Sequence, residues 1–484
     1  MPARQLPATA RRTRIVATIG PATAEDAILE ALLAAGMDAA RVNFSHGDPA
    51  TQAGLVRRLR ALGRRNGRPL AVIADLPGPK LRVGELSAPL HVAAGATVSV
   101  GMGTAVPLTD PEMLAHVRAG DRVLVDDGAV ALTVLSAGDG RASLRALNEG
   151  VVSSHKGVNL PDTSLPVSAV TARDRELLGI ALEAGADHIA LSFVRSASDA
   201  ADLRAALAEA GSAARIISKI EKKEALAAIH EIVAASDAVM VARGDLGVEI
   251  PPAEVPLWQK AIIAAARRAG RPAITATQML QSMVDNPRPT RAEASDVANA
   301  ILDSTDAVML SAETAVGAYP VEAVLTMAEI AVRAERGLPG IVVCETAPTD
   351  ALGPLLTAAG DREAAITGAI SSGACDVANR VGAVAIVTST LSGRTARAVA
   401  RLRPVQPVIA LSADPLVRDQ LALCWGVTPL PCAGADSFEE VVQEADGVLL
   451  AHGICRRGDL VVITAGMQGY TPGTTNLIKA HVVR

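Results

Sequence analysis

The chain has 484 residues, a length that allows about two to four domains with their own cores. Half of the residues are hydrophobic but only 1% are aromatic, so any core must be built from alanine, valine, leucine and isoleucine. The net charge of −5 argues against nucleic acid or an anionic membrane as a partner, and no apolar run is long enough to span a membrane. The five cysteines include no CxxC pair, and the basic residues 1–14 lack the apolar stretch of a signal peptide. We therefore expect reduced thiols, no structural zinc and a cytoplasmic protein.

The first 77 residues alternate between apolar strands and amphipathic helices. Strands are predicted at residues 14–21, 39–47 and 70–75, and helices at residues 24–35 and 49–66. Such alternation is typical of parallel βα units.

Residues 78–166 follow another pattern. Short alternating strands separated by Gly and Asp turns are predicted at residues 96–100, 122–125, 129–135 and 142–147. The chain enters this segment near Gly78-Pro79 and leaves it near Leu165-Pro166. Both places carry proline, and the first also carries glycine, as expected of a hinge. We therefore predict an all-β domain inserted between two parts of an α/β domain.

The βα rhythm resumes after the insertion and then starts again near residue 339. Strands are predicted at residues 187–193, 215–220, 238–243, 272–277 and 307–311, and later at 383–388, 408–411 and 460–464. Three strands before the insertion and five after it make eight, which favours a closed (β/α)8 TIM barrel. The predicted domains are the barrel at 1–77 and 167–338, the β lid at 78–166, and a C-terminal open α/β regulatory domain at 339–484.

Two neighbouring strands of the predicted barrel end in charged residues. Lys219 and Glu221 close one strand, and Asp245 follows the glycine that breaks the next strand. Carboxylates at one rim suit a divalent cation such as magnesium, and a lysine beside a metal suits an anionic substrate. An ordinary surface salt bridge between strand ends is the simpler alternative.

Every predicted barrel strand except the first ends in a polar group. These residues are Arg41, Asn43, Ser45, His46, Asp75, Ser192, Lys219, Glu221, Asp245, Thr277, Ser311 and Glu313. In a TIM barrel the carboxyl ends of the strands form the rim where active sites lie. Arg41 and Arg82 can bind phosphate oxygens, and Gly244-Asp245 opens a helix whose free N–H groups can bind a carboxylate. The set predicts phosphoryl transfer assisted by a metal.

Six segments of the chain resemble the pyruvate kinase family. They are residues 43–47 (Asn-Phe-Ser-His-Gly), 156–161 (Lys-Gly-Val-Asn-Leu-Pro), 217–221 (Ile-Ser-Lys-Ile-Glu), 240–249, 276–280 and 286–293. The resemblance covers nearly the whole chain in the right order. It implies transfer of the phosphoryl group of phosphoenolpyruvate to ADP, giving pyruvate and ATP, by a homotetramer whose mobile lid closes over the site.

The resemblance also implies roles for individual residues. Glu221 and Asp245 correspond to ligands of Mg²⁺ (or Mn²⁺), and Lys219, Arg41, Arg82 and Thr277 to catalytic residues. Residues corresponding to the substrate site are Ser192, Ala242, Arg243, Gly244, Asp245 and Thr277, together with Arg41 and Lys219. Asn43, Ser45 and Asp75 match a monovalent-cation region, and His46, Asn43 and Lys156 match nucleotide contacts.

Two departures from the family pattern concern ligands. Lys80 stands where members that require potassium carry glutamate, and Leu76 replaces a threonine that helps to bind the ion, so we expect no requirement for potassium. Thr390, Ser392, Gly393, Arg394 and Thr395 resemble the loop that binds the phosphate of an allosteric effector. Leu391 stands where members activated by fructose 1,6-bisphosphate carry lysine, which favours a monophosphate such as AMP or a hexose phosphate.

Simpler interpretations exist for several of these features. The barrel could belong to another metal-dependent phosphoenolpyruvate or oxoacid enzyme, such as a lyase or mutase, or to an inactive metabolite sensor. Asn43 and Ser45 could cap the next helix, and His46 could bond only the local backbone. Lys222 and Lys223 are expected on a solvated helix face, and Asp127 in a turn.

Overall fold

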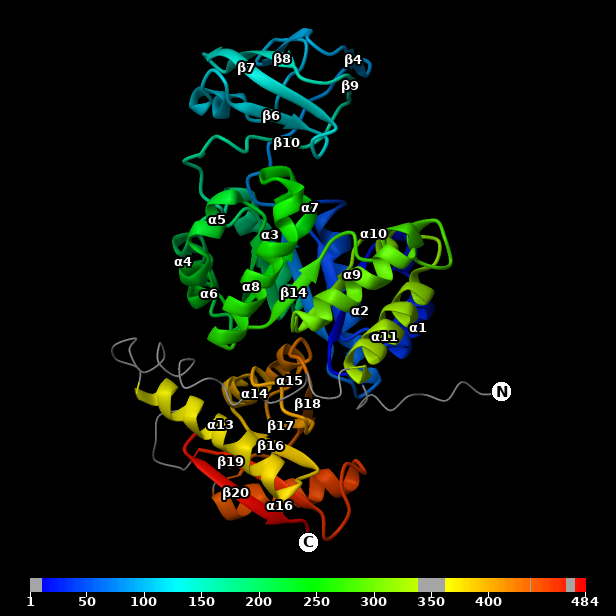
Figure 1. Cartoon of the computed structure of the whole chain (residues 1–484), viewed down its shortest axis with the longest axis vertical. Helices are drawn as coiled ribbons and strands as arrows, with labels where there is room; N and C mark the ends of the chain where they lie inside the picture. The colour runs from blue at the N-terminus through cyan, green and yellow to red at the C-terminus, as the bar shows by residue number, and fades with distance from the viewer. Residues whose placement is uncertain (1–10, 338–361, 436, 467–474) are drawn as a thin grey trace.

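The computed structural model describes residues 11–337, 362–435, 437–466 and 475–484. Figure 1 shows three bodies stacked along the long axis, with the lid at the top, the barrel in the middle and the C-terminal domain at the bottom. The N-terminal residues that are described belong to the barrel, and the C-terminus lies at the far end of the bottom body.

Eight parallel strands close the barrel in the order β1-β15-β14-β13-β12-β11-β3-β2. Their bounds are β1 (Arg14–Ile19), β2 (Ala39–Asn43), β3 (Ala71–Leu76), β11 (His188–Leu191), β12 (Arg215–Ile220), β13 (Ala238–Ala242), β14 (Ala273–Ala276) and β15 (Ala307–Leu310). The strands are buried almost throughout, because small and β-branched residues fill the inside while the surrounding helices cover the outside. The predicted fold class is confirmed.

The outer ring consists of helices that lie between consecutive strands. They are α1 (Asp26–Ala35), α2 (Pro49–Arg65), α3 (Ala172–Ala184), α4 (Ala197–Glu209), α5 (Lys223–Ala227), α6 (Ile229–Ala235), α7 (Arg243–Glu249), α8 (Val255–Ala269), α9 (Arg291–Leu302), α10 (Ala312–Ala315) and α11 (Pro320–Arg336). In the described part of the chain no helix is long and apolar enough to cross a membrane.

Several barrel strands end earlier than predicted, and two of them do so for the same reason. β11 stops at Leu191, two residues before Phe193, and β14 stops at Ala276. The cause is the backbone, since Phe193 and Thr277 have φ angles of 57° and 67°. Residues other than glycine seldom adopt this left-handed backbone conformation, and a strand cannot continue through it. Both turns point polar groups across the rim.

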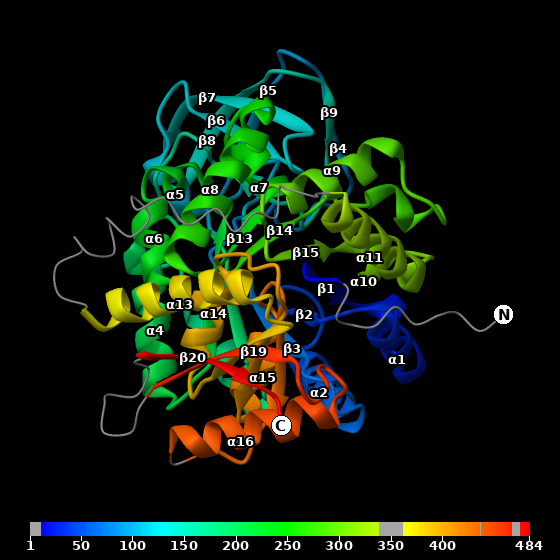
Figure 2. The same ribbon diagram turned by 60° about the horizontal axis from the view of Figure 1, so that its bottom comes forward.

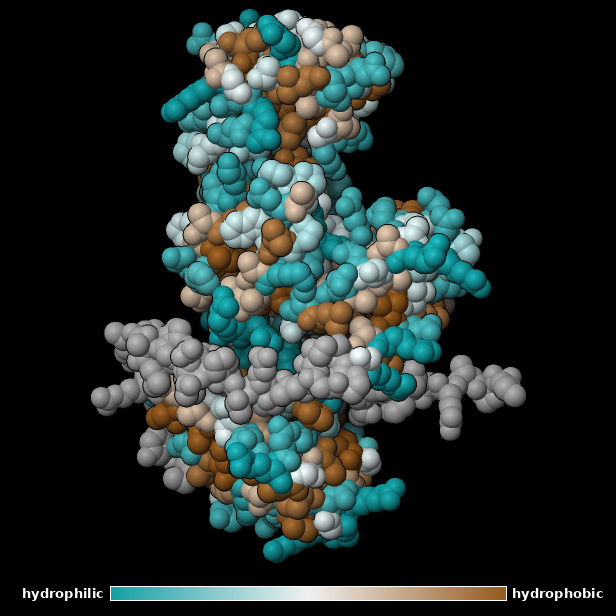
Figure 3. Space-filling view, viewed as in Figure 1, coloured by the Kyte–Doolittle hydropathy of each residue, from teal (hydrophilic) through white to brown (hydrophobic). Residues whose placement is uncertain are grey.

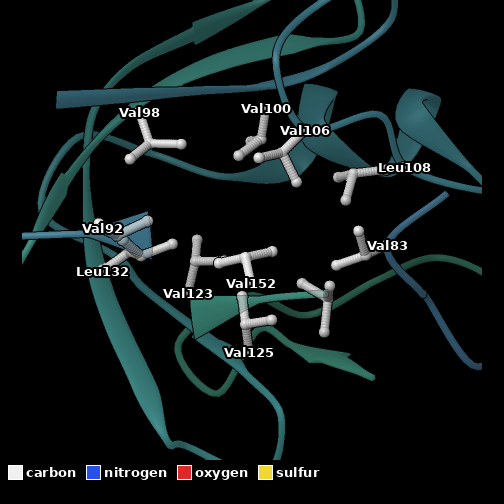
Figure 4. A pocket seen from close by; sticks show the side chains of 11 residues that line it. Val83, Val92, Val98, Val100, Val106, Leu108, Val123, Val125, Leu132 and Val152 are labelled. Carbon is white, nitrogen blue, oxygen red and sulfur yellow. The ribbon is translucent and has the colours of Figure 1, made fainter. Parts of the chain in front are cut away.

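The lid has a five-stranded sheet, a two-stranded sheet and a core of its own. Its strands are β4 (Leu90–Val92), β5 (Thr97–Gly101), β6 (Arg122–Val125), β7 (Val130–Gly138), β8 (Arg141–Ala146), β9 (Gly150–Val152) and β10 (Val158–Asn159). Figure 4 shows valine and leucine side chains from opposite sides of the lid pointing toward a common apolar centre. With almost no aromatic residues available, valine fills this core.

The C-terminal domain is an open sheet in the order β18-β17-β16-β19-β20, in which only β20 is antiparallel. Its elements are α13 (Arg362–Val381), β16 (Ala385–Ser389), α14 (Arg394–Ala400), β17 (Val408–Ser412), α15 (Pro415–Leu421), β18 (Val427–Pro431), α16 (Phe438–Ala451), β19 (Leu460–Ala465) and β20 (Leu477–Val482). Ala422 and Leu423 pack among side chains inside the barrel. Figure 2 shows this domain against the end of the barrel opposite the lid.

The precise domain boundaries stay predictions, and the one between residues 338 and 339 lies outside the described residues. On the face drawn in Figure 3, hydrophobic residues are scattered among hydrophilic ones on the barrel and the lid. Scattered exposed apolar residues are ordinary for a folded protein and mark no site by themselves.

Candidate active site

Lys219 lies at the centre of the carboxyl-terminal rim of the barrel. Its ammonium donates to Ser192 Oγ at 2.7 Å and lies 3.3 Å from Glu221 Oε2 and 3.5 Å from Asp75 Oδ1. Burial by itself would lower the pKa of Lys219, but the carboxylates of Asp75, Glu221 and Asp245 outweigh it and raise the pKa. The lysine is therefore a fixed positive charge at neutral pH.

Glu221 and Asp245 supply the carboxylates that the sequence predicted for a metal. Glu221 Oε1 accepts a hydrogen bond from the Phe193 N–H at 2.6 Å, whereas the buried Oε2 has no hydrogen-bond partner among the described residues. Burial raises the pKa of Glu221 to about 7 against the opposing effect of Lys219, and the charge of Asp245 adds to the rise. A buried carboxylate oxygen that accepts no hydrogen bond, 3.3 Å from the Lys219 ammonium and close to a second carboxylate, fits the donor set of a divalent cation.

No cluster of three or more His, Cys, Asp or Glu side chains that could hold a metal was found in the described ranges. Two carboxylates still fit magnesium, because this ion is commonly held by one or two carboxylates together with water and substrate oxygens. The site is thus of the kind that is completed by its substrate.

Arg41 and Asp75 form a buried pair beside Lys219. Arg41 Nε lies 2.6 Å from Asp75 Oδ2, and its Nη1 donates to Thr18 Oγ1 at 3.1 Å. Burial would raise the pKa of Asp75, but Lys219 and Arg41 hold it below its usual value. Since only 13% of the Arg41 side chain and 12% of that of Lys219 are exposed, the alternative of an ordinary surface salt bridge is wrong.

Thr277 joins the end of β14 to the start of α7. Its hydroxyl accepts a hydrogen bond from the Gly244 N–H at 2.8 Å and donates to the Ala276 carbonyl at 2.6 Å. The left-handed backbone at Thr277 aims this hydroxyl at the helix. Arg243 has another task, because its guanidinium donates to the Thr277 carbonyl and to Asp296 of α9, which fixes α7 against the barrel.

A cleft of ≈1060 Å³ opens between this rim and the lid. Gly244, Asp245 and Thr277 line the barrel side, and Asp127 lines it from the lid. Asp127 lies in a turn as expected, with a φ of 52°. It also lines the cleft, which the turn-forming sequence around it could not indicate. Gln278 and Ser295 were not predicted as site residues, yet they line the same cleft from two different segments.

A second group of predicted residues lies beside the base of the lid. Burial lowers the pKa of His46, and the charges of Arg82, Lys80 and Arg41 lower it further, so these four side chains belong to one neighbourhood. The Arg82 guanidinium donates to the His155 carbonyl at 3.0 Å. The fold therefore brings together β2, the loop that follows it and the crossing to the lid.

Asn43, Ser45 and Lys156 take up defined positions as well. Asn43 Oδ1 accepts from the Ser45 N–H at 3.0 Å, while the cap of α2 is Asp48, which accepts from the Thr51 N–H at 2.9 Å. The alternative that Asn43 or Ser45 caps this helix is therefore wrong. Lys156 lies 3.0 Å from Asp126 within the lid.

The expectation that Lys222 lies on a solvated helix face is wrong, whereas Lys223 is exposed as expected. The Lys222 ammonium lies 2.7 Å from Glu249 Oε1, and Glu249 is fully buried. Asn159 of the lid donates to the same oxygen at 3.4 Å. Lys222 therefore balances a buried charge where the barrel meets the lid.

Replacement of Lys222 by methionine is expected to lower the free energy of unfolding by about 3 kcal/mol, because it leaves the Glu249 carboxylate buried without a cation. Chemical denaturation would measure the change, with Lys223→Met as the exposed control. The double variant Lys222→Met/Glu249→Leu should recover most of the loss. Equal stability of the Lys222→Met and Lys223→Met variants would contradict this account.

The predicted effector loop lies between β16 and α14. Thr390 Oγ1 accepts a hydrogen bond from the Gly393 N–H at 2.9 Å, and the Thr395 hydroxyl pairs with that of Thr475. The Ser392 carbonyl accepts from Arg215 of the barrel at 3.0 Å. Much of the polar capacity of this loop is therefore used within the protein.

Taken together, the closed barrel, its inserted lid and the charged rim define an enzyme of the (β/α)8-barrel class that handles anionic substrates. Residues 10–324 match the family model described as pyruvate kinase, barrel domain, and residues 368–481 match pyruvate kinase, alpha/beta domain. The chain belongs to the pyruvate kinase family. Its reaction transfers the phosphoryl group of phosphoenolpyruvate to ADP at the last step of glycolysis.

Individual relatives agree with the family models over nearly the whole chain. A pyruvate kinase of Mycobacterium tuberculosis (strain ATCC 25618 / H37Rv) is 44% identical over 478 residues, which cover 97% of this chain and 98% of that protein. One from Geobacillus stearothermophilus is 42% identical over 484 residues, covering 98% and 80% respectively. A crystal structure of a pyruvate kinase from Cryptosporidium parvum superimposes with a TM-score of 0.90 at 33% identity, covering 99% of this chain and 97% of that one. These matches decide against a lyase, a mutase or an inactive sensor.

Proposed function

We propose that Lys219 is the group that stabilises the transferring phosphoryl group and the enolate of pyruvate. The observation that supports this role is its buried ammonium, fixed between Asp75 and Glu221 at the rim of the cleft. A charge fixed in advance where negative charge develops needs no reorganisation during the reaction. Arg41 and Arg82 bind phosphate oxygens in this proposal, and Ser192 holds the lysine in place.

Glu221 and Asp245 are proposed to hold Mg²⁺ or Mn²⁺, which neutralises charge on the phosphate oxygens when it is bound. The N–H groups at the start of α7, from Ala242 to Asp245, bind the substrate carboxylate, and Thr277 lies near the carbon that receives a proton. His46, Asn43 and Lys156 contact ADP. Closure of the lid excludes water, which would otherwise accept the phosphoryl group.

These roles are tested by a coupled assay of pyruvate formation in which phosphoenolpyruvate, ADP and the divalent cation are omitted one at a time. Activity should need all three. Pyruvate formation at the full rate without ADP, or without a divalent cation in the presence of a chelator, would contradict the proposal.

We propose that the ammonium of Lys80 replaces potassium. The side chain is half-buried and close to Gly157, since a Cβ at that glycine would lie 3.1 Å from Lys80 Cε. Its charge also acts on His46. A potassium ion next to this ammonium would be repelled by an energy on the order of kilocalories in a partly dry site. In this proposal Asn43, Ser45 and Asp75 line the monovalent-cation region, and the Lys80 ammonium supplies the positive charge there in place of potassium.

The enzyme is expected to be fully active when an inert organic cation replaces all sodium and potassium, with magnesium still required. Lys80→Glu should lower the rate and make it partly responsive to potassium, although Leu76 limits the recovery. Initial rates across a potassium series would measure both effects, and Lys223→Glu serves as a charge-reversal control at an exposed lysine. Strong activation of the unmodified enzyme by potassium would refute the idea.

We further propose that the enzyme is a homotetramer controlled by a phosphorylated effector at the loop from Thr390 to Thr395. Arg394→Ala is expected to remove the effect of an activating monophosphate on the cooperativity toward phosphoenolpyruvate, because a guanidinium–phosphate contact is lost. Saturation curves with AMP and hexose phosphates would show it. Curves that none of these phosphates changes, or an activation that survives in Arg394→Ala, would exclude this site.

A further inference from the structure

The chain passes between the barrel and the lid twice, through segments that contain neither helix nor strand. The first crossing comprises residues 77–81 after β3, and the second comprises residues 160–171 before α3. Figure 1 shows the lid above the barrel, joined to it by these irregular segments. Because neither crossing has a backbone ladder of its own, contacts with the barrel set the direction in which the lid leaves it.

Arg195, which lies between β11 and α4, holds the second crossing. Its Nη1 donates to the Leu165 carbonyl, and its Nη2 donates to the Val167 carbonyl at 2.6 Å. The side chains of Leu165 and Val167 pack against the apolar core of the lid. One barrel side chain therefore binds the backbone of two residues whose side chains belong to the lid.

The guanidinium of Arg195 is itself fixed by Asp199 in the first turn of α4. Asp199 Oδ1 lies 3.1 Å from Nη2, and Asp199 Oδ2 accepts hydrogen bonds from the Arg195 N–H at 2.8 Å and the Ser196 N–H at 3.2 Å. Only 20% of the Arg195 side chain and 6% of that of Asp199 are exposed. A planar guanidinium held in this way presents its donors to two carbonyls with little further loss of freedom.

The turn that carries Arg195 also supports the proposed catalytic groups. Ser192 Oγ accepts a hydrogen bond from the Lys219 ammonium at 2.7 Å and donates to the Leu76 carbonyl, where the first crossing begins, at 2.8 Å. The next residue, Phe193, donates its N–H to Glu221 at 2.6 Å. The second crossing is thus held by the same short turn that holds the lysine and the carboxylate of the rim.

The barrel ends of the two crossings are tied to each other by Asp174 of α3, which is fully buried. Its Oδ1 accepts from the Gly78 N–H of the first crossing at 3.0 Å. Its Oδ2 accepts from the Thr171 N–H at 2.9 Å and from the Thr171 hydroxyl at 2.6 Å, at the end of the second crossing. With both ends fixed here, the hydrogen bonds of Arg195 set the path of the second crossing toward the lid.

We propose that Arg195 is a positioning residue that holds the lid over the rim for the binding of ADP. The inference rests on the proposed function, in which Lys156 of the lid contacts ADP, and the lid also brings Asp127 to the cleft. Among the described residues that line the cleft, Arg195 does not occur, so it acts through the lid and not on the substrate. The groups proposed to bind phosphoenolpyruvate and the metal lie on the barrel and do not need this clamp.

The test compares Arg195→Ala with the unmodified full-length enzyme. With phosphoenolpyruvate and magnesium saturating, the KM for ADP should rise about tenfold or more and kcat should fall, because two charge-assisted hydrogen bonds to the second crossing are lost. Equilibrium binding of phosphoenolpyruvate, and of Mn²⁺ followed by electron paramagnetic resonance, should stay unchanged. Guanidinium ion, at concentrations too low to denature the protein, should restore part of the rate of Arg195→Ala.

Two further variants separate positioning from folding and from charge. Arg195→Lys keeps the positive charge but not the planar fork, so the KM for ADP should rise in the same direction by a smaller factor. It also provides the measurement if Arg195→Ala does not fold, which melting temperatures would show. Arg173→Ala is the control, because this arginine on α3 is 57% exposed and should leave every constant unchanged.

An unchanged KM for ADP in folded Arg195→Ala or Arg195→Lys would overturn the inference. If the unmodified enzyme still requires ADP, phosphoenolpyruvate and a divalent cation in the omission assay, the proposed function stands and only the clamp is excluded. Weaker Mn²⁺ binding in the Arg195 variants would show that the arginine supports Glu221 instead of the lid. An equal change in Arg173→Ala would mean that the surface charge of the barrel matters and not this contact.

Discussion

Lys219→Met is expected to lower the turnover number by about 10² to 10³, the usual loss when a fixed electrostatic stabiliser is removed. In the proposed mechanism the ammonium, buried 3.3 Å from Glu221 and 3.5 Å from Asp75, interacts most strongly with charge that develops during transfer. Binding of phosphoenolpyruvate should change much less, because Arg41 and the start of α7 remain. Steady-state kinetics and equilibrium binding of phosphoenolpyruvate would separate the two effects.

Lys223→Met is the matched control for this variant, since Lys223 lies nearby in sequence but is exposed. Its turnover should equal that of the unmodified enzyme. A Lys219→Met enzyme that is folded and keeps more than about a tenth of the normal rate would contradict the assigned role.

Glu221→Gln is expected to weaken Mn²⁺ or Mg²⁺ binding at least about tenfold and to lower turnover by about a hundredfold, since the metal is worth several kcal/mol of charge stabilisation. The amide oxygen can still accept the hydrogen bond from Phe193, and a neutral side chain avoids burying a charge. The metal-free variant should therefore be at least as stable as the unmodified protein. Titration with Mn²⁺ followed by electron paramagnetic resonance would measure binding without relying on activity.

The exposed Glu231 of α6 provides the control, because Glu231→Gln removes the same charge from the surface of the barrel. Normal Mn²⁺ affinity in Glu221→Gln would show that Glu221 is not a ligand. A metal-free Glu221→Gln protein that melts far below the unmodified one would show that the carboxylate has a structural task instead.

Much of the fold could be predicted because its signals are local. Each barrel strand is an apolar run, every one but the first is followed by a polar residue, and the inserted lid changes the period of the pattern. The charged rim followed from the same rule, since the carboxyl ends of parallel strands meet at one edge. The order of the strands was therefore enough to predict that Lys219, Glu221 and Asp245 lie at the same rim.

The features that escaped prediction depend on contacts between distant segments. The sequence around Lys222 predicts a surface residue, because only the fold shows that Glu249 and Asn159 lie next to it. Among the strands that end earlier than predicted, β11 and β14 do so through left-handed backbone at Phe193 and Thr277, which neither residue favours. A cavity between the barrel and the C-terminal domain is lined both by Arg215 of β12 and by residues of α14 far along the chain, and no spacing rule relates them.

The separate core of the lid has a consequence for how the molecule melts. The valines of the lid pack on one another and not on the barrel, whereas Leu423 of the C-terminal domain inserts among the side chains inside the barrel. Cooperativity follows shared packing, so we expect the barrel and the C-terminal domain to unfold as one unit and the lid as another. We expect the lid to open, or even to lose its structure for a time, while the strand that carries Lys219 keeps its place.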